Sequence, residues 1–355
     1  MLELVTELPL LTAGLPGTGG RLRAAPEDFR VVELPAYEAS GEGDHVIAVV
    51  DKRDLTTLEA VRRMAAALGV QTGDVGIAGM KDRHAVTRQQ LSFPPPVSPE
   101  AVLALEVEGV RVLAAARHPH KLRTGHLHGN EFTIVIRDPA VPADEAAARA
   151  RAVLDALAAP PGSPNWFGKQ RFGRDGETAA LGRALIRGER LPGRPPRGRQ
   201  RRLFISAYQS LLFNEYLRRR IAAGAYRQVL AGDLLRKTDS GGLFASTEPE
   251  VDQARLERGE LAPTGPMFGH QMRGPAPGSA AAAVEEEVLA AEEIEVSDFA
   301  RARKLATGTR RAIAVPLSQP TARALPDNAI EVAFSLPSGG YATAVLSELV
   351  KGNAC

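Results

Sequence analysis

The first 160 residues carry several apolar runs with the spacing of β-strands. Residues 44–50 form a short apolar run that suits a buried strand, and 75–78 and 87–93 predict two further strands on either side of a glycine turn. Over 132–136, Phe and Ile alternate with Thr and Val, which is the period of a half-buried strand. These patterns predict a sheet in the first part of the chain.

Helical signals lie between these strands. Thr56 and Glu59 fit a capping box, and Gly69 supplies a helix stop, so a helix is predicted over 57–68. The face that we expect to be buried carries Leu58, Val61, Ala65 and Leu68. Ser98-Pro99-Glu100 opens a second helix, and the alanine-rich stretch 143–158 predicts a third.

The pattern changes at the proline-rich stretch 160–164. From there to about residue 314 the chain reads as mostly helical with loops, and Ser206 with Gln209 predicts the start of a helix that runs to Gly224. Strand alternation returns over 330–336 and is followed by an apolar helix over 343–350. This order predicts an inserted region, after which the last strand completes the sheet of the first part.

Length and composition agree with two globular domains. The chain has 355 residues, 44% hydrophobic and 24% charged, against a usual domain size of about 100–200 residues. Its single cysteine, Cys355, excludes a disulfide scaffold and a thiolate zinc site. The N-terminus lacks the features of a secretory signal, and no apolar stretch reaches the roughly 18 residues of a membrane span. We therefore expect a cytoplasmic protein.

The basic residues are unevenly distributed. The net charge is only +2, and seven of the 44 basic residues are lysines. One segment holds Arg187, Arg190, Arg194, Arg197, Arg199, Arg201 and Arg202 against a single acid, Glu189. Such a segment suits phosphate contacts with a polyanion, while a solvated, proline-broken loop is an equally good interpretation at this point.

Two other stretches are poor candidates for cofactor or metal chemistry. The glycine-rich stretch 14–20 has no Lys-Ser/Thr after it and is interrupted by a proline, so it is not a phosphate-binding Walker loop. Histidines recur at His118, His120, His126 and His128, but Lys121 and Arg123 lie between them and would repel a metal ion. Polar contacts with a ligand or RNA are the better hypothesis for these histidines.

The most informative stretch is residues 76–89. It places Asp82 in a tight glycine turn between two predicted strands, with Lys81 and Arg83 on either side. Neighbouring cations favour the ionised carboxylate that a nucleophile or a proton acceptor requires. From local sequence alone, a structural aspartate that caps its own turn is the simpler alternative.

Three further segments combine polar groups with an aromatic ring. They are residues 26–29, which follow Arg21 and Arg23, residues 129–132 at the start of a strand, and residues 339–343 before the last helix. In a chain with 5% aromatic residues, rings at strand and turn edges are candidates for stacking on RNA bases. Each segment alone is also compatible with ordinary core packing.

Seven segments, in order along nearly the whole chain, resemble the tRNA pseudouridine synthase D (TruD) family. They are PEDF at Pro26–Phe29, SGEGDH at Ser40–His45, AGMKDRHAVTRQ at Ala78–Gln89, GNEFTI at Gly129–Ile134, PNWFGKQRFG at Pro164–Gly173, GPMFG at Gly265–Gly269 and FSLPSGGYATAVLSEL at Phe334–Leu349. The resemblance implies an α+β fold, in which a pseudouridine-synthase catalytic domain with a central mixed or antiparallel sheet is interrupted by a mostly helical α/β insertion, the TRUD domain. We expect the catalytic domain over 1–160 and 315–355 and the insertion over 161–314.

The resemblance also implies roles for residues within these segments. Asp82 corresponds to the family's catalytic aspartate. Phe29, Asn130 and Tyr341 correspond to residues that line the pocket for the target base. The family usually has Phe where this chain has Tyr341, a change that keeps an aromatic face and adds a hydroxyl.

Three further residues complete the candidate set for substrate binding. Arg23 stands where the family often has Lys, and we expect it to partner either Asp82 or a phosphate. Lys81 and Phe132 belong to the same segments as Asp82 and Asn130.

The implied activity is the isomerisation of uridine to pseudouridine in tRNA, at uridine 13 of particular tRNAs. This reaction needs neither a cofactor nor a metal, because it involves no redox change and no phosphate transfer. We expect tRNA as the partner, no membrane association and a monomeric enzyme. Two other classes stay open: a non-catalytic RNA-binding or ribosome-assembly protein, and an Asp-dependent glycosidase or hydrolase, which usually needs a second carboxylate.

Overall fold

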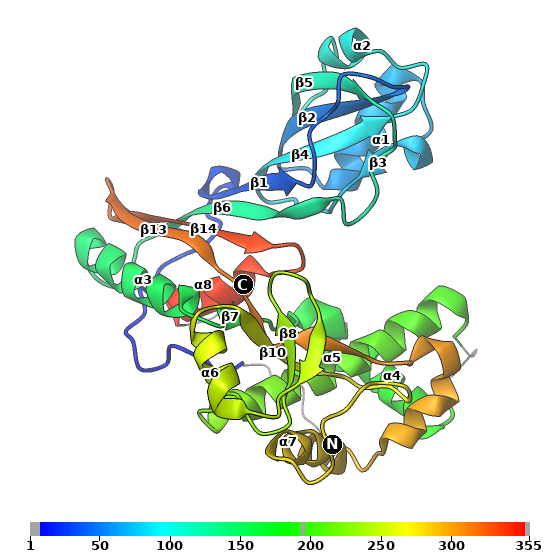
Figure 1. Ribbon diagram of the computed structural model, residues 1–355. Coiled ribbons are helices and arrows are strands. Elements are labelled where there is room, and N and C mark those ends of the chain that lie inside the picture. The colour runs from blue at the N-terminus through cyan, green and yellow to red at the C-terminus, as the bar shows by residue number, and fades with distance from the viewer. Residues whose placement is uncertain (1–7, 192, 194–195, 352–355) are drawn as a thin grey trace. The chain divides into compact units, whose positions relative to one another are not determined.

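The computed structural model describes residues 8–191, 193 and 196–351, and this part of the chain divides into two compact units (Figure 1). The sheet unit holds the described residues of 14–156, 317–342 and 349–355. The helical unit holds those of 1–13, 157–316 and 343–348. The limits of the catalytic and TRUD domains given above stay a prediction.

An eight-stranded mixed sheet forms the centre of the sheet unit. Its order is β13-β14-β6-β1-β4-β2-β5, and β3 pairs with β4 off this path. The strands are β1 (Phe29–Pro35), β2 (His45–Arg53), β3 (Gly76–Ile77), β4 (Val86–Phe93), β5 (Val110–His118), β6 (Leu127–Arg137), β13 (Ser318–Leu325) and β14 (Ala329–Pro337). β14 pairs with β6 from Ala329 opposite Arg137 to Pro337 opposite Gly129 (Figure 1). The last strand therefore completes the sheet of the first part, as predicted.

The helices of the sheet unit are α1 (Thr57–Leu68), α2 (Pro99–Leu103) and α3 (Ala143–Ala158), with short 3₁₀ turns η1 (Pro26–Asp28) and η2 (Thr72–Asp74). As predicted, the Thr56 side chain caps α1 by accepting from the backbone N–H of Glu59, and Gly69 ends it with a φ of 68°. The prediction that Leu58 is buried is wrong: this residue is 55% exposed, whereas Met64 is buried. The buried face of α1 is centred on Ala60, Val61 and Met64, and Leu58 falls at its edge.

The helical unit is built around α5 (Gly198–Ala222), whose buried side chains form its main core. The other helices are α4 (Glu177–Arg187), α6 (Pro249–Glu257) and α7 (Ala280–Ala291), with 3₁₀ segments η3 (Lys169–Phe172), η4 (Arg174–Gly176) and η5 (Val296–Leu305). α4 packs closely on α5 because Gly182 has no side chain; a Cβ there would lie 2.1 Å from the carbonyl oxygen of Phe204. No helix in the described part of the chain is long and apolar enough to cross a membrane.

A four-stranded sheet, in the order β11-β10-β8-β9, lies in the same unit. Its strands are β8 (Leu234–Lys237), β9 (Leu243–Ala245), β10 (Leu261–Met267) and β11 (Thr309–Ala312), and β7 (Ser163–Pro164) pairs separately with β12 (Ala314–Val315). The last helix of the chain, α8 (Ala342–Val350), lies where the apolar run at 343–350 predicts it.

The predicted start of the long helix is wrong. α5 begins at Gly198, so Ser206 and Gln209 lie inside the helix. Their polar groups have partners on other segments: Ser206 Oγ accepts from Arg171, and Gln209 Nε2 donates to the carbonyl of Phe268 at 2.6 Å. A capping pattern in the sequence can therefore serve tertiary hydrogen bonds.

Candidate active site

The backbone of the Asp82 turn, between β3 and β4, is held from two sides. The N–H of Lys81 donates to Thr57 Oγ1 at 2.9 Å, at the start of α1, and the same hydroxyl donates to Gln89 of β4. The carbonyl of Asp82 accepts a 2.7 Å hydrogen bond from the ammonium of Lys52 on β2. The carboxylate itself is 57% exposed. A fixed backbone thus presents a reachable carboxylate.

Lys52 is a buried cation beneath this turn, with 1% of the residue exposed. Its ammonium donates to two backbone carbonyls, those of Leu55 and Asp82. Burial lowers the pKa of Lys52 from 10.5 to about 8, while the nearby charge of Asp82 acts in the opposite direction. Lys52 therefore fixes the position of Asp82 through the backbone.

Lys81 points into the protein. Its ammonium forms a buried ion pair with Glu33 of β1, whose other carboxylate oxygen accepts from the backbone N–H of Gln90 on β4 at 3.0 Å. Gly79 makes room for this pair, because a Cβ there would lie 3.3 Å from the ammonium. The direct partner of this cation is thus Glu33, and Lys81 ties the turn to two strands of the sheet.

The carboxylate of Asp82 is paired with Arg23, one of the two partners expected for that arginine. The guanidinium donates to Asp82 Oδ2 at 2.8 Å and lies 4.3 Å from the centre of the Phe29 ring. A cation over an aromatic face is attracted to it. Arg23 has a φ of 57°, an uncommon backbone conformation for a residue with a side chain. It thereby joins the candidate aspartate to the first candidate base-pocket ring.

The rings of Phe29 and Phe132 lie in the core of the sheet unit, in agreement with the core-packing alternative for their segments. Their exposed fractions are 2% and 7%. The two rings meet edge to face with centres 6.3 Å apart, and Phe132 also contacts Phe334 of β14 at 5.5 Å. The cause is the strand register, which sets Phe132 between Val31 of β1 and Phe334.

Asn130 lies on β6, opposite Glu33 of β1 on one side and Leu336 of β14 on the other. Its side-chain oxygen is buried and, among the described residues, has no hydrogen-bond partner. Such an acceptor is available to a ligand N–H.

Tyr341 is half-buried and lies just after β14, in a turn that is held by the N–H of Ser338 donating to the carbonyl of His128 at 2.9 Å.

Asn130 and Tyr341 differ in how the structure connects them to the Asp82 turn. Asn130 pairs in register with Glu33, whose carboxylate binds Lys81 of the Asp82 turn. No contact recorded over residues 8–191, 193 and 196–351 joins Tyr341 to Asp82. Its place at the site stays a prediction.

Comparison with known proteins extends this picture to the whole chain. A family model described as tRNA pseudouridine synthase D (TruD) matches residues 6–191 and 197–349. A protein named tRNA pseudouridine synthase D from Anaeromyxobacter dehalogenans is 50% identical over 353 residues, which cover 99% of this chain and 98% of the relative. One with the same name from Thermus thermophilus is 40% identical over 346 residues, 98% and 93% of the two chains. This chain belongs to the TruD family.

Comparison with a solved structure also confirms the predicted fold of this chain. A crystal structure from Methanosarcina mazei, described as a putative tRNA pseudouridine synthase D, superposes with a TM-score of 0.85 over 99% of this chain and 98% of that one. The sequence identity of 24% is low, so this likeness is one of fold. It agrees with the α+β architecture that the resemblance implies.

In this TruD chain two of these histidines contact Tyr37. The Tyr37 hydroxyl lies 2.6 Å from His126 Nδ1, and its ring stacks on His118 with centres 5.0 Å apart. Burial, and then the neighbouring His120 and His45, lower the pKa of His118. Within the described ranges, no three His, Cys, Asp or Glu side chains are grouped as metal ligands would be. The expectation that no metal or cofactor takes part stays a prediction.

The arginine-rich segment divides into parts with different surroundings. Arg187, at the end of α4, pairs with Glu189 at 2.8 Å and with Glu293 at 3.6 Å. Arg194 lies outside the described residues. The α5 arginine cluster comprises Arg197, Arg199, Arg201 and Arg202. It forms the N-cap and first turns of α5, so the interpretation as a proline-broken loop is wrong from residue 198 onward.

Sequence reasoning missed Glu33 and Lys52, although both carry a signal. On β1 the buried positions alternate as Phe29, Val31 and Glu33, and on β2 Lys52 follows Val50 at the same spacing. A charged residue at an inward position of an alternating strand indicates a buried ion pair or a carbonyl-bound cation. The strands predicted from sequence do not include β1, and the strand predicted over 44–50 ends before Lys52. Neither signal is therefore visible in them.

Proposed function

We propose that this chain converts uridine to pseudouridine in tRNA, that the target is uridine 13 of particular tRNAs, and that Asp82 is the catalytic residue. Membership of the TruD family over nearly the whole chain is the observation that carries the proposal. The geometry of the Asp82 turn supports it, because an exposed carboxylate on a fixed backbone is what an attacking or proton-accepting group requires.

The reaction breaks the bond between uracil N1 and ribose C1′, turns the base and forms a bond between C5 and C1′. C5 loses its proton and N1 gains one, so atoms and charge balance without a cofactor. Asp82 acts as an anion, either by adding to the substrate or by removing a ribose proton. Arg23 orients this anion through its 2.8 Å hydrogen bond.

The detached uracil has to be retained while it turns. We propose that Phe29, Phe132 and Tyr341 line the base pocket and that Asn130 binds a uracil edge. The buried, unbonded oxygen of Asn130 supports this role, since a uracil N–H would satisfy it. Because Arg23 covers the Phe29 ring, this guanidinium must shift when a base stacks there.

The target uridine must leave its stack, which costs a few kcal/mol, so the enzyme needs further contacts with RNA. We propose the α5 arginine cluster as one source. Arg197, Arg199 and Arg202 are exposed, and over the described residues none of them pairs with a carboxylate. Positive side chains at the positive end of a helix gain nothing from the helix dipole, whereas an RNA phosphate would be attracted by both.

The test is tRNA from a deletion strain, mapped by pseudouridine-selective labelling, and the same tRNA treated with purified protein. Loss of pseudouridine at position 13, restored by wild-type protein and not by the Asp82→Asn variant, is the expected result. A glycosidase would release free uracil, and a non-catalytic assembly protein would retain its role in the Asp82→Asn variant. We further propose that the enzyme acts in the cytoplasm as a monomer.

A further inference from the structure

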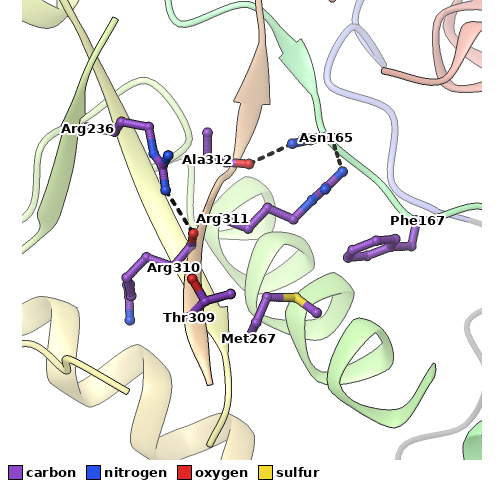
Figure 2. A pocket seen from close by; sticks show the side chains of 8 residues that line it. All are labelled: Asn165, Phe167, Arg236, Met267, Thr309, Arg310, Arg311 and Ala312. Carbon is purple, nitrogen blue, oxygen red and sulfur yellow. Dashed lines mark hydrogen bonds between the residues drawn. The ribbon is translucent and has the colours of Figure 1, made fainter. Parts of the chain in front are cut away.

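The helical unit, which does not contain Asp82, has a pocket of about 410 Å³ lined by three arginines, Arg236, Arg310 and Arg311, together with Asn165, Phe167 and Met267 (Figure 2). Its volume is in the range of small-ligand sites, roughly 300–1,000 Å³. Among the described residues, no carboxylate lines it. An open, shallow site with this charge suits an anion.

Arg310 holds the pocket together. It forms a buried 2.6 Å ion pair with Glu285 of α7 and donates to the carbonyl of Thr264 on β10 at 2.7 Å. Its charge is therefore neutralised within the protein, and it fixes β11 against β10 and α7.

Arg311 is oriented before any ligand arrives. Its guanidinium lies 4.2 Å from the centre of the Phe167 ring and donates to Asn165 Oδ1, while Asn165 Nδ2 donates to the carbonyl of Ala312 at 2.9 Å (Figure 2). Phe167 is itself fixed, because its N–H and C=O both bond to the Asn214 side chain. A planar cation held in this way loses little conformational freedom on binding.

Arg236 lies on β8 across the pocket. One of its terminal nitrogens donates to the carbonyl of Arg310 at 3.0 Å (Figure 2). Its Nε is buried and, in the described part of the chain, has no hydrogen-bond partner, and no carboxylate there pairs with this arginine. A buried donor without a partner is uncommon, and an anionic oxygen would satisfy it.

Two of the segments that carry the family resemblance meet at this pocket. Pro164–Gly173 supplies Asn165 and Phe167, and Gly265–Gly269 supplies Met267. Neither segment is used by the proposed catalytic site. The apolar side of the pocket, formed by Phe167 and Met267, lies next to the two guanidinium groups.

We propose that this pocket binds one nucleotide of the tRNA other than the target uridine, with its phosphate on Arg236 and Arg311 and its base or ribose against Phe167 and Met267. This inference rests on the proposed function for the identity of the RNA. Arginine is suited to both halves of such a ligand, since it binds phosphate through two donors and stacks on flat rings.

The test uses full-length protein carrying Asp82→Asn, so that binding is measured without turnover. Arg236→Gln and Arg311→Gln are compared with Arg258→Gln, a control in which an exposed arginine of the same unit loses the same charge. We expect each pocket variant to weaken tRNA binding about tenfold or more and to lower the log–log salt slope by roughly 0.7–0.9, while the control changes neither. Wild-type affinity and slope in both pocket variants would overturn the proposal.

A second experiment tests whether the bound phosphate belongs to tRNA or to a free metabolite. Uridine monophosphate and inorganic phosphate are titrated into the same proteins by calorimetry. Pocket-dependent binding of either, together with unchanged tRNA affinity, would make this a site for a free metabolite and overturn the RNA assignment. If Arg311→Gln lacks a cooperative unfolding transition, Arg236→Gln alone decides. Pseudouridine formation by the enzyme with Asp82 intact is scored separately, so a failure of the proposed function is not mistaken for a failure of this one.

Discussion

Arg23 donates a 2.8 Å charge-assisted hydrogen bond to the carboxylate of Asp82, and the two residues are 59 positions apart in the chain. The same guanidinium lies over Phe29, at the start of β1. A base that stacks on this ring and reacts at this carboxylate must therefore meet Arg23 first. In the proposed mechanism, Arg23 therefore connects base binding with the reacting anion.

Asp82→Asn should abolish isomerisation and leave tRNA affinity within about tenfold of wild type, because the amide keeps the shape and loses basicity and nucleophilicity. Single-turnover assays and tRNA binding measure the two effects. Asp74→Asn, at an exposed aspartate of the same unit, is the matched control and should be silent. Appreciable single-turnover activity in Asp82→Asn would remove this residue from the catalytic role.

Substitutions at Arg23 should separate charge from geometry. Arg23→Gln removes the ion pair with Asp82 and should lower the single-turnover rate by roughly 10- to 100-fold, the usual effect of losing a charged hydrogen bond. Arg23→Lys keeps the charge and should retain most of the rate. Equal rates for Arg23→Gln and wild type would show that this pair plays no part in the reaction.

The elements that sequence patterns predict correctly are those with local signals. The capping threonine and the closing glycine of α1 act within their own helix, so residues 56–69 contain everything that sets its ends. The Arg23–Asp82 pair needed the family resemblance as well, because nothing local brings residues 59 positions apart together.

The elements that were missed depend on distant partners. Ser206 reads as a helix cap, yet its hydroxyl serves Arg171 and the helix begins eight residues earlier. The buried pair of Lys81 and Glu33 depends on the parallel alignment of β1 with β4, which no local pattern records. Tertiary contacts decide such positions, and local propensity is only a weak guide to them.

Lys52 should make stability depend on pH in the alkaline range. The unfolded chain holds this proton up to about pH 10.5, and the folded protein loses it near pH 8. Between these values the unfolded state binds more protons, so the free energy of unfolding rises with pH. From about pH 7.5 to 10.5, wild type should gain up to about 3 kcal/mol relative to Lys52→Met.

Denaturant unfolding at several pH values measures this difference. Lys237→Met, at an exposed lysine, is the control and should show no comparable change relative to wild type. If the difference in free energy of unfolding between wild type and Lys52→Met stays constant across this pH range, burial does not lower the pKa of Lys52.

Reversing the charge of Arg197, Arg199 and Arg202 should weaken tRNA binding. Each lost phosphate contact should lower the log–log salt slope by roughly 0.7–0.9. Glutamate suits the first turn of a helix, so these changes should leave α5 folded, which circular dichroism can check. If affinity and slope stay at the wild-type values, the cluster is a solvated helix end and not an RNA contact.

Tyr341 gives the sharpest test of the base pocket, because the family usually has Phe at this position. If its ring stacks on the target uracil, Tyr341→Phe should be nearly silent and Tyr341→Ala should lose about 1–3 kcal/mol of stacking free energy. This pattern is expected because Asp82 is the base in the proposed mechanism, and a neutral phenol is a poor base. Single-turnover rates and tRNA affinities of both variants measure it. A Phe variant as impaired as the Ala variant would assign the hydroxyl a role of its own, and a wild-type Ala variant would place Tyr341 outside the pocket.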